Sequence, residues 1–131
     1  FVFLSTTNVN NPDLVRVDEQ IITCSFLNSG QLSLCSMIYA SNSYISRRPL
    51  WQHIKELSSF ILDPWVIMGD FNAILHADEK LGHASSAISM REFRSCVEVS
   101  KLILEKGNSH VWPFRTLHTW EPPSPTKRSL P

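Results

Sequence analysis

Apolar residues recur along this chain with strand-like spacing in some stretches and helical spacing in others. Two strand-like stretches cover residues 19–27 and 32–40. Asn28-Ser29-Gly30-Gln31 lies between them and predicts a tight turn, because glycine readily takes a positive φ. The pattern therefore predicts a β-hairpin.

A two-residue loop in this hairpin would fix the register of its strands. Cys24 would lie directly opposite Cys35, and Ile22 opposite Met37, with all four side chains on one face of the pair. Free cysteine commonly serves as a small core hydrophobe, so packing is the leading interpretation of both thiols. A cross-strand disulfide is the alternative.

Helical spacing predicts a first helix over residues 49–62. Pro49 suits the first turn, where its missing N–H costs little, and Asp63-Pro64 stops the helix. His53 and Lys55 are expected on other faces than the apolar stripe. The stripe itself consists of Leu50, Ile54, Leu57 and Ile61, widened by Trp51.

A second helix is predicted over residues 90–106. Ser89 and Glu92 have the Ser-x-x-Glu spacing of a capping box, and Gly107 suits the carboxyl-terminal cap. Its apolar stripe consists of Met90, Phe93, Val97 and Leu104, flanked by Cys96 and Ile103.

The remaining segments are short or irregular. Residues 1–4 and 65–68 are apolar runs that fit strands, and residues 8–13 have turn chemistry. The amino end, inside an apolar run, is interpreted as a cut edge. We expect residues 1–107 to form one partial domain and residues 108–131, rich in proline, to be an irregular tail.

Composition indicates a folded chain without the signature of an autonomous nucleic-acid binder. Apolar residues make up 43% of the 131 residues, enough for one domain with a core. Twelve basic and twelve acidic residues give no net charge. Proteins that bind nucleic acid by themselves usually carry a basic excess, because neutralising phosphate charge supplies much of their affinity.

Cysteine usage suggests a reduced intracellular setting. The three cysteines are odd in number and lack the spacing of zinc ligands. No apolar run approaches the roughly 20 residues of a membrane span, so no membrane association is expected.

Candidate chemistry is concentrated in Gly69-Asp70-Phe71-Asn72, which directly follows the apolar run at 65–68. In a layered α/β protein, polar groups at the carboxyl edge of a buried strand reach the crevice where ligands bind. Asp70 and Asn72 would point to the same side in extended geometry, and could bind a hydrated cation, orient a water or hold a phosphate oxygen. Alternatively, either residue merely caps a turn.

The neighbouring segments extend this motif. Ile38-Tyr39-Ala40-Ser41, Arg47-Arg48-Pro49-Leu50-Trp51 and Glu79-Lys80-Leu81-Gly82 occur with Gly-Asp-Phe-Asn in an order that resembles the endonuclease/exonuclease/phosphatase superfamily. Their wording is most similar to the endonuclease domains of LINE-type (non-LTR) retrotransposons, over residues 17–104. The fold implied is α/β, a partial α/β/β/α sandwich, and the resemblance implies a nuclear location if the protein is functional.

The resemblance implies roles for three residues. Asp70 matches the aspartate that positions and polarises the attacking water, and Asn72 the asparagine that contacts the phosphate or metal environment. Tyr39 matches the tyrosine that hydrogen-bonds the scissile phosphate, although it could also be a buried strand aromatic. Arg47 and Arg48 could contact backbone phosphates, or simply begin a solvated helix.

The chain also departs from the family pattern. No residue matches the glutamate that holds Mg²⁺ in the family, since Glu19 lies in another context. The family's Ser-Asp-His segment is missing too, because none of the five histidines occupies such a sequence: His53, His76, His83, His110 and His118. The metal site is therefore incomplete, and Mg²⁺ binding by this chain is doubtful.

These observations leave three functional interpretations. The leading one is a retrotransposon-derived endonuclease-like fragment, impaired or inactive, whose intact parent would cleave DNA with a divalent metal and be associated with a reverse transcriptase. The second is a fragment of a phosphatase or phospholipase of the same superfamily. The third is a non-catalytic interaction module whose uncovered sheet surface docks a partner or drives self-association.

Overall fold

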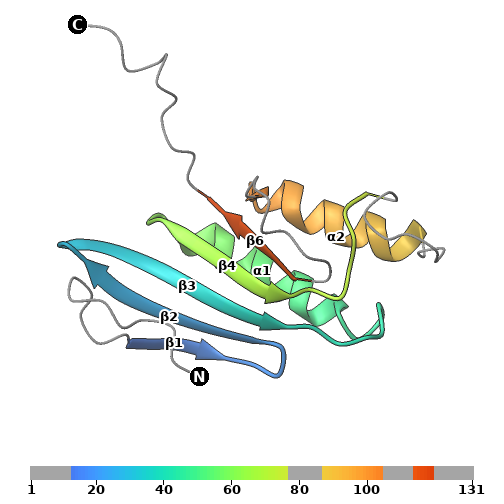
Figure 1. Ribbon diagram of the computed structural model, residues 1–131, viewed down its shortest axis with the longest axis horizontal. Coiled ribbons are helices and arrows are strands. Elements are labelled where there is room, and N and C mark those ends of the chain that lie inside the picture. Colours follow the sequence, from blue (N-terminus) through green and yellow to red (C-terminus); the bar gives the residue numbers. More distant parts are fainter. Residues whose placement is uncertain (1–12, 77–86, 105–113, 120–131) are drawn as a thin grey trace, which may run out of the picture.

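The computed structural model describes residues 13–76, 87–104 and 114–119 of the chain. Within them six strands form one sheet, with two helices beside it (Figure 1). The strands are Asp13–Val17 (β1), Ile21–Asn28 (β2), Gln31–Tyr39 (β3), Trp65–Asp70 (β4), Ile103–Leu104 (β5) and Phe114–His118 (β6). The helices are Arg48–Phe60 (α1) and Ala87–Val99 (α2). The strand order is β1-β2-β3-β4-β6-β5, so the predicted α/β class is confirmed.

The predicted hairpin is formed by β2 and β3, in the predicted register. Ser29 and Gly30 form its loop with φ values of 52° and 83°, the positive φ pair that matches the twist of the two strands. Cys24 pairs with Cys35 and Ile22 with Met37. Both cysteines are free thiols, and Cys35 is buried, as the packing interpretation predicts.

The arrangement that positions the site is the β3-α1-β4 unit. β3 and β4 are parallel, so the chain must return along the sheet between them, and α1 makes this crossover (Figure 1). Because the two strands run in the same direction, their carboxyl ends meet at one edge of the sheet. Tyr39 and Asp70, the last residues of the two strands, are partners in the register.

Both helices contribute to one hydrophobic core against the sheet. Leu50, Trp51, Ile54 and Leu57 of the predicted stripe are buried on α1, whereas Ile61 lies just beyond the helix end and is partly buried. Phe93 and Cys96 supply the buried side chains of α2. The strands contribute alternate residues to the same cluster, including Ile21, Ile38, Trp65, Ile67 and Leu117.

The opposite face of the sheet is more exposed. Arg16 pairs with Thr23 in the register and reaches Glu56 of α1, which identifies the side of Thr23 as the helix-facing side. The residues between the helix-facing positions are apolar but only half buried: Ile22, Cys24, Phe26, Met37, Val66 and Met68. One sheet with helices on one face is part of the implied sandwich, and the described residues contain no second sheet.

The second helix ends earlier than its apolar stripe predicted. It spans Ala87–Val99, and the predicted stop near Gly107 is wrong because Lys101 takes the left-handed conformation, with φ 55°. Leu102 N–H then donates to Val97 O over 2.9 Å, and Lys101 N–H to Glu98 O over 3.1 Å. These two bonds are a Schellman cap, which usually has glycine at the left-handed position. Residues 103 and 104 consequently belong to β5.

The predicted irregular tail is wrong at Phe114–His118, which forms β6 beside β4. The strand pattern was not recognised because an inward position, where an apolar residue is expected, is occupied by the cation Arg115. Its guanidinium lies 5.2 Å from the ring centroid of Phe93 and donates to Ala73 O over 3.1 Å. The strand β1 at the sheet edge was also not predicted, and its side chains are all exposed.

His53 also differs from prediction. It was expected on another face of the first helix than the apolar stripe, yet it is buried beside that stripe. The predicted strand at 1–4, the Glu79-Lys80-Leu81-Gly82 segment and the proline-rich end lie outside the described residues. No helix in the described part of the chain is long and apolar enough to cross a membrane.

Candidate active site

The site begins with a glycine that lets β4 approach β3 closely. Gly69 has φ 135°, a conformation that side chains with a Cβ rarely adopt. A Cβ at this position would collide with the main-chain nitrogen and oxygen of Ile38 on β3. Glycine is therefore required one residue before Asp70, at the end of the strand.

Phe71 anchors the motif to the core. Its side chain is 0% exposed, and its ring is stacked 5.3 Å from the ring centroid of Phe93 and 6.5 Å from that of Trp51. Ala73, Ile74 and Leu75 are buried too, and Arg94 donates to Leu75 O over 2.6 Å. With Phe71 fixed inside, Asp70 and Asn72 on either side of it are held at the surface.

Asp70 and Asn72 form a tight local turn. Asn72 has φ 48°, so the chain leaves the extended geometry that we predicted for this pair. The Asn72 N–H donates to Asp70 Oδ1 over 2.9 Å, and Asn72 Nδ2 donates to Ala40 O over 2.7 Å. The turn-capping interpretation thus describes part of what these residues do. It does not remove them from the surface, because both side chains are only partly buried.

Both residues line a cleft at the carboxyl edge of β3 and β4. The cleft has a volume of about 550 Å³, and most of the groups that line it are polar. Tyr39 lines it as well, so the three predicted site residues come together in one cavity. The full lining is Glu19, Gln20, Tyr39, Ala40, Ser41, Asn42, Ser46, Asp70 and Asn72.

Tyr39 is not a buried strand aromatic. Its side chain is 78% exposed at the end of β3, and its register partner across the parallel pair is Asp70. Its main-chain N–H donates to Gln20 O over 3.0 Å, which fixes the backbone while leaving the ring at the cleft. A phenol in this position can hydrogen-bond a ligand bound in the cleft at the carboxyl edge of β3 and β4.

The two arginines have different environments. Arg47 is only 4% exposed, and its guanidinium donates to Ser41 O, Asn42 O and Ser89 Oγ over 2.7 to 3.0 Å. Burial lowers the pKa of Arg47, an effect that nearby Glu92 and Asp70 oppose. Arg47 thus links the loop that follows β3 to α2 in the protein interior. A side chain buried in this way does not favour a phosphate contact.

Arg48 is exposed and pairs with Glu92, with a distance of 2.9 Å from Nη2 to Oε1. Ser89 and Glu92 were predicted to cap α2. Because this helix begins at Ala87, they lie within its first two turns. Ser89 accepts a hydrogen bond from Arg47 instead, and Glu92 accepts one from Arg48.

Glu19 and Gln20 are site residues that the sequence did not reveal. They belong to the connection between β1 and β2, and both line the cleft. Gln20 binds the loop between β3 and α1 at two points. Ser41 N–H donates to Gln20 Oε1 over 2.7 Å, and Gln20 Nε2 donates to Ser46 O over 3.0 Å. The unpredicted strand β1 explains the omission, since this connection exists only because β1 pairs with β2.

The described residues do not fit a complete magnesium site. Among them, no group of three or more His, Cys, Asp or Glu side chains lies close enough to hold a metal ion. Asp70 Oδ1 also accepts a hydrogen bond from the Asn72 N–H. Mg²⁺ prefers oxygen ligands in octahedral geometry, so Asp70 would need further ligands from substrate and water.

Comparison with known proteins supports the fold. No family model and no curated protein matches the sequence. Among solved structures, the chain is similar to the endonuclease domain of TRAS1, a telomere-specific non-LTR retrotransposon. The TM-score is 0.60 at 11% identity, with 82% of this chain and 54% of that chain covered. It also matches the catalytic domain of human Nocturnin with a bound sulfate anion, at TM-score 0.47 and 14% identity, over 85% of this chain and 47% of that chain.

The chain spans about half the length of these solved domains, with 54% and 47% of them covered. At an identity as low as 11%, structural similarity supports the fold and does not establish the activity. The strand order, the parallel β3-α1-β4 unit and the match to the retrotransposon endonuclease domain agree with one another. The chain has the fold of a partial endonuclease/exonuclease/phosphatase-type domain.

Proposed function

We propose that this chain is part of a DNA phosphodiesterase domain, retrotransposon-derived, whose cleft receives a backbone phosphate and whose own catalysis is impaired. The observation that carries the proposal is the convergence of Asp70, Asn72 and Tyr39 on one polar cleft. The similarity of fold to a retrotransposon endonuclease domain supports the same substrate class.

Each of the three residues has a chemically suitable role. Asp70 has one carboxylate oxygen fixed by the Asn72 N–H, which orients the second oxygen to position a water. Asn72 Nδ2 carries two N–H groups, so the bond to Ala40 O uses one and the other can donate to a phosphate oxygen. The exposed Tyr39 hydroxyl would donate to the same phosphate.

The proposed impairment follows from the missing partners of these groups. The glutamate that binds Mg²⁺ and the Ser-Asp-His segment of the family pattern have no match in this sequence. Where catalytic residues act as a unit, removing one of them abolishes most of the enzyme's rate enhancement. We therefore expect phosphate binding to persist where cleavage does not.

Plasmid nicking in the presence of Mg²⁺ tests the impairment. We expect wild type to nick supercoiled plasmid no faster than the Asp70→Ala variant. Robust nicking by wild type that the Asp70→Ala variant lacks would show an intact active site and overturn the proposal of impairment. The flanking reading frames test the proposed origin, because a downstream reverse transcriptase is expected.

A related superfamily activity is the first alternative. Gly-Asp-Phe-Asn is shared with phosphatases and phospholipases, whereas the Arg47-Arg48-Pro49-Leu50-Trp51 and Glu79-Lys80-Leu81-Gly82 segments favour the nuclease branch. Release of phosphate from inositol phosphates, lost on substitution of Asp70, would favour the alternative.

Self-association is a second candidate, favoured by one specific observation. Leu14, Val15 and Val17 are exposed on β1, an edge strand, next to the half-buried apolar face of the sheet. Exposed edges and apolar faces of sheets commonly pair with other chains. Size-exclusion chromatography with light scattering would reveal a dimer or larger species, and a clean monomer at all concentrations would exclude this candidate.

A further inference from the structure

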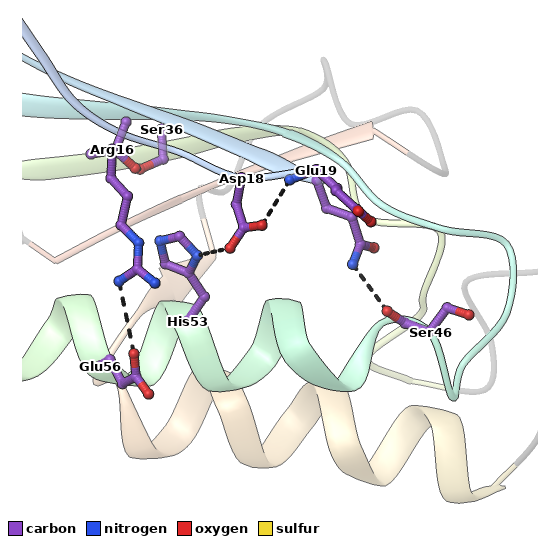
Figure 2. Close-up of polar contacts among 9 residues, drawn as sticks. Arg16, Asp18, Glu19, Ser36, Ser46, His53 and Glu56 are labelled. Carbon is purple, nitrogen blue, oxygen red and sulfur yellow. Dashed lines mark hydrogen bonds and ion pairs between the residues drawn. The ribbon is translucent and has the colours of Figure 1, made fainter.

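The connection between β1 and β2 forms one wall of the cleft. Hydrogen bonds hold this connection, and Figure 2 draws several of them. Asp18 N–H donates to Ile21 O over 2.8 Å, and Asp18 Oδ1 accepts from Glu19 N–H over 2.9 Å. Gln20 then binds Ser41 and Ser46 on the loop that follows β3. The wall therefore depends on the conformation of three consecutive residues, 18 to 20.

His53 is the point at which the core holds this connection. It projects from α1 toward Asp18, with 3.1 Å between its Nδ1 and Asp18 Oδ2 (Figure 2). His53 is 4% exposed, whereas Asp18 is exposed. Its other ring nitrogen, Nε2, is buried and has no hydrogen-bond partner among the described residues. The bond to Asp18 is thus the polar interaction that this buried side chain makes within the described part of the chain.

The hydrogen bond between His53 and Asp18 joins a ring N–H to a carboxylate. The pKa of Asp18 is lowered, first by the Glu19 N–H and then by the hydrogen bond to His53. A carboxylate only accepts hydrogen bonds, so Nδ1 must carry a proton. Among the described residues, Glu19 and the pair formed by Arg16 and Glu56, at 3.8 Å, carry charges near this bond (Figure 2).

We propose that His53 is a positioning residue for the cleft: its Nδ1–H holds Asp18 so that Glu19 and Gln20 stand against Tyr39 and Asp70. This inference rests on the proposed function of the cleft as a phosphate site. It adds a residue on α1 that lines no part of the cavity, and it gives a buried histidine a specific role. Because α1 is packed into the core, the same bond fixes the position of the cleft wall relative to α1.

Three variants separate the hydrogen bond from packing. His53→Asn keeps an N–H at the Nδ1 position, since Asn Nδ2 is the same number of bonds from the main chain. His53→Leu keeps bulk and removes the donor. Ser36→Ala is the matched control, because Ser36 is fully buried and bonds Thr23 Oγ1 and Trp65 Nε1 away from the connection. It should lower stability without moving the wall.

Two measurements follow the wall and the cleft separately. Hydrogen exchange of the Ser41 amide reports on its bond to Gln20 Oε1. Fluorescence anisotropy with a labelled DNA duplex, in Ca²⁺ to suppress cleavage, reports on the cleft. We expect His53→Leu to speed Ser41 exchange and to weaken DNA binding by about tenfold, the factor that one hydrogen bond to a charged group contributes. His53→Asn and Ser36→Ala should stay close to wild type in both.

Each other outcome has a definite meaning. Unchanged Ser41 exchange in His53→Leu would overturn the inference, as would a His53→Asn variant that behaves like His53→Leu, since packing would then explain the effect. Faster Ser41 exchange with unchanged DNA affinity would show that the wall does not serve the cleft, which also overturns it. If wild type binds no DNA while Ser41 exchange follows the expected order, the proposed function fails and the structural role of His53 stands.

Discussion

Asn72 donates from Nδ2 to the main-chain oxygen of Ala40 over 2.7 Å, and this bond joins the chain just beyond β4 to the chain just beyond β3. The two residues are 32 apart in sequence. In the opposite direction, Ala40 N–H donates to Asp70 O over 2.8 Å. The ends of two parallel strands are thereby tied into one surface, on which Tyr39, Asp70 and Asn72 are presented together.

Asn72 contributes to stability in two ways, through its left-handed backbone conformation and through its hydrogen bond to Ala40 O. Asn72→Gly keeps the left-handed conformation accessible and loses the bond to Ala40, whereas Asn72→Ala loses the bond and also strains the backbone. We expect urea unfolding to show a loss of about 1 kcal/mol for Asn72→Gly and about 2 kcal/mol or more for Asn72→Ala. Equal losses would mean that the positive φ carries no cost.

Gly69 and Gly30 provide a matched pair of glycines. Both have positive φ, but a Cβ at Gly30 would meet open space and a Cβ at Gly69 would collide with the main chain of Ile38. We expect Gly30→Ala to cost about 1 kcal/mol, and Gly69→Ala to cost about 3 kcal/mol or to prevent folding. Thermal unfolding measures both, and similar melting temperatures would contradict the close strand contact.

Arg47 and Arg48 are adjacent residues with different expected effects. Arg47→Met removes buried hydrogen bonds to three acceptors, which should reduce the free energy of unfolding by about 3 kcal/mol. Arg48→Met removes an exposed pair with Glu92, whose side chains are 51% and 26% exposed, and should cost under about 1 kcal/mol. Denaturant titration of both variants checks the contrast. A larger cost for Arg48→Met would contradict the internal role of Arg47.

The thiols should react in an order set by burial. Burial raises the pKa of Cys35 to about 11 and that of Cys96 to about 12, from an ordinary value of 9.0. Because the thiolate is the reactive form, a thiol reagent at neutral pH should label the half-buried Cys24 first. Mass spectrometry of partly labelled protein identifies the site. Preferential labelling of Cys96 would contradict the packing of α2.

The same shifts predict the direction of alkaline destabilisation. Both thiols hold their protons more tightly in the folded chain than in the unfolded chain, so their contribution to stability is complete below about pH 9. It should be lost as the pH rises toward 11 and 12. Unfolding experiments over this range should show a smaller loss for Cys96→Ala than for wild type, and an equal loss would argue against the buried thiol as its cause.

The hairpin, α1 and β4 could be predicted because their sequence patterns are local. Apolar periodicity identified these elements, and the turn at Ser29 and Gly30 fixed which residues pair. The site motif was also recognisable, since Asp70 ends an apolar strand and Asn72 lies two residues further along the chain. Each of these features depends on neighbours in the chain.

What the sequence did not reveal depends on contacts between distant residues. Arg115 can stand at an inward position of β6 because Phe93 and Ala73 O receive it. Lys101 ends α2 in a conformation that usually calls for glycine. His53 is buried on α1, and its hydrogen-bond partner Asp18 comes from the distant connection between β1 and β2. The contribution of Glu19 and Gln20 to the cleft likewise requires β1, an edge strand without a buried face.

The most direct test of the proposed function is to map DNA binding onto the chain by amide NMR. A DNA duplex would be titrated in Ca²⁺, with Asp70→Asn as the control variant. We predict that shifted amides cluster around Tyr39, Ser41, Asp70 and Asn72, and that the shifts change in the control. Shifts elsewhere on the molecule, or no binding at all, would contradict the assignment of this cleft as a phosphate site.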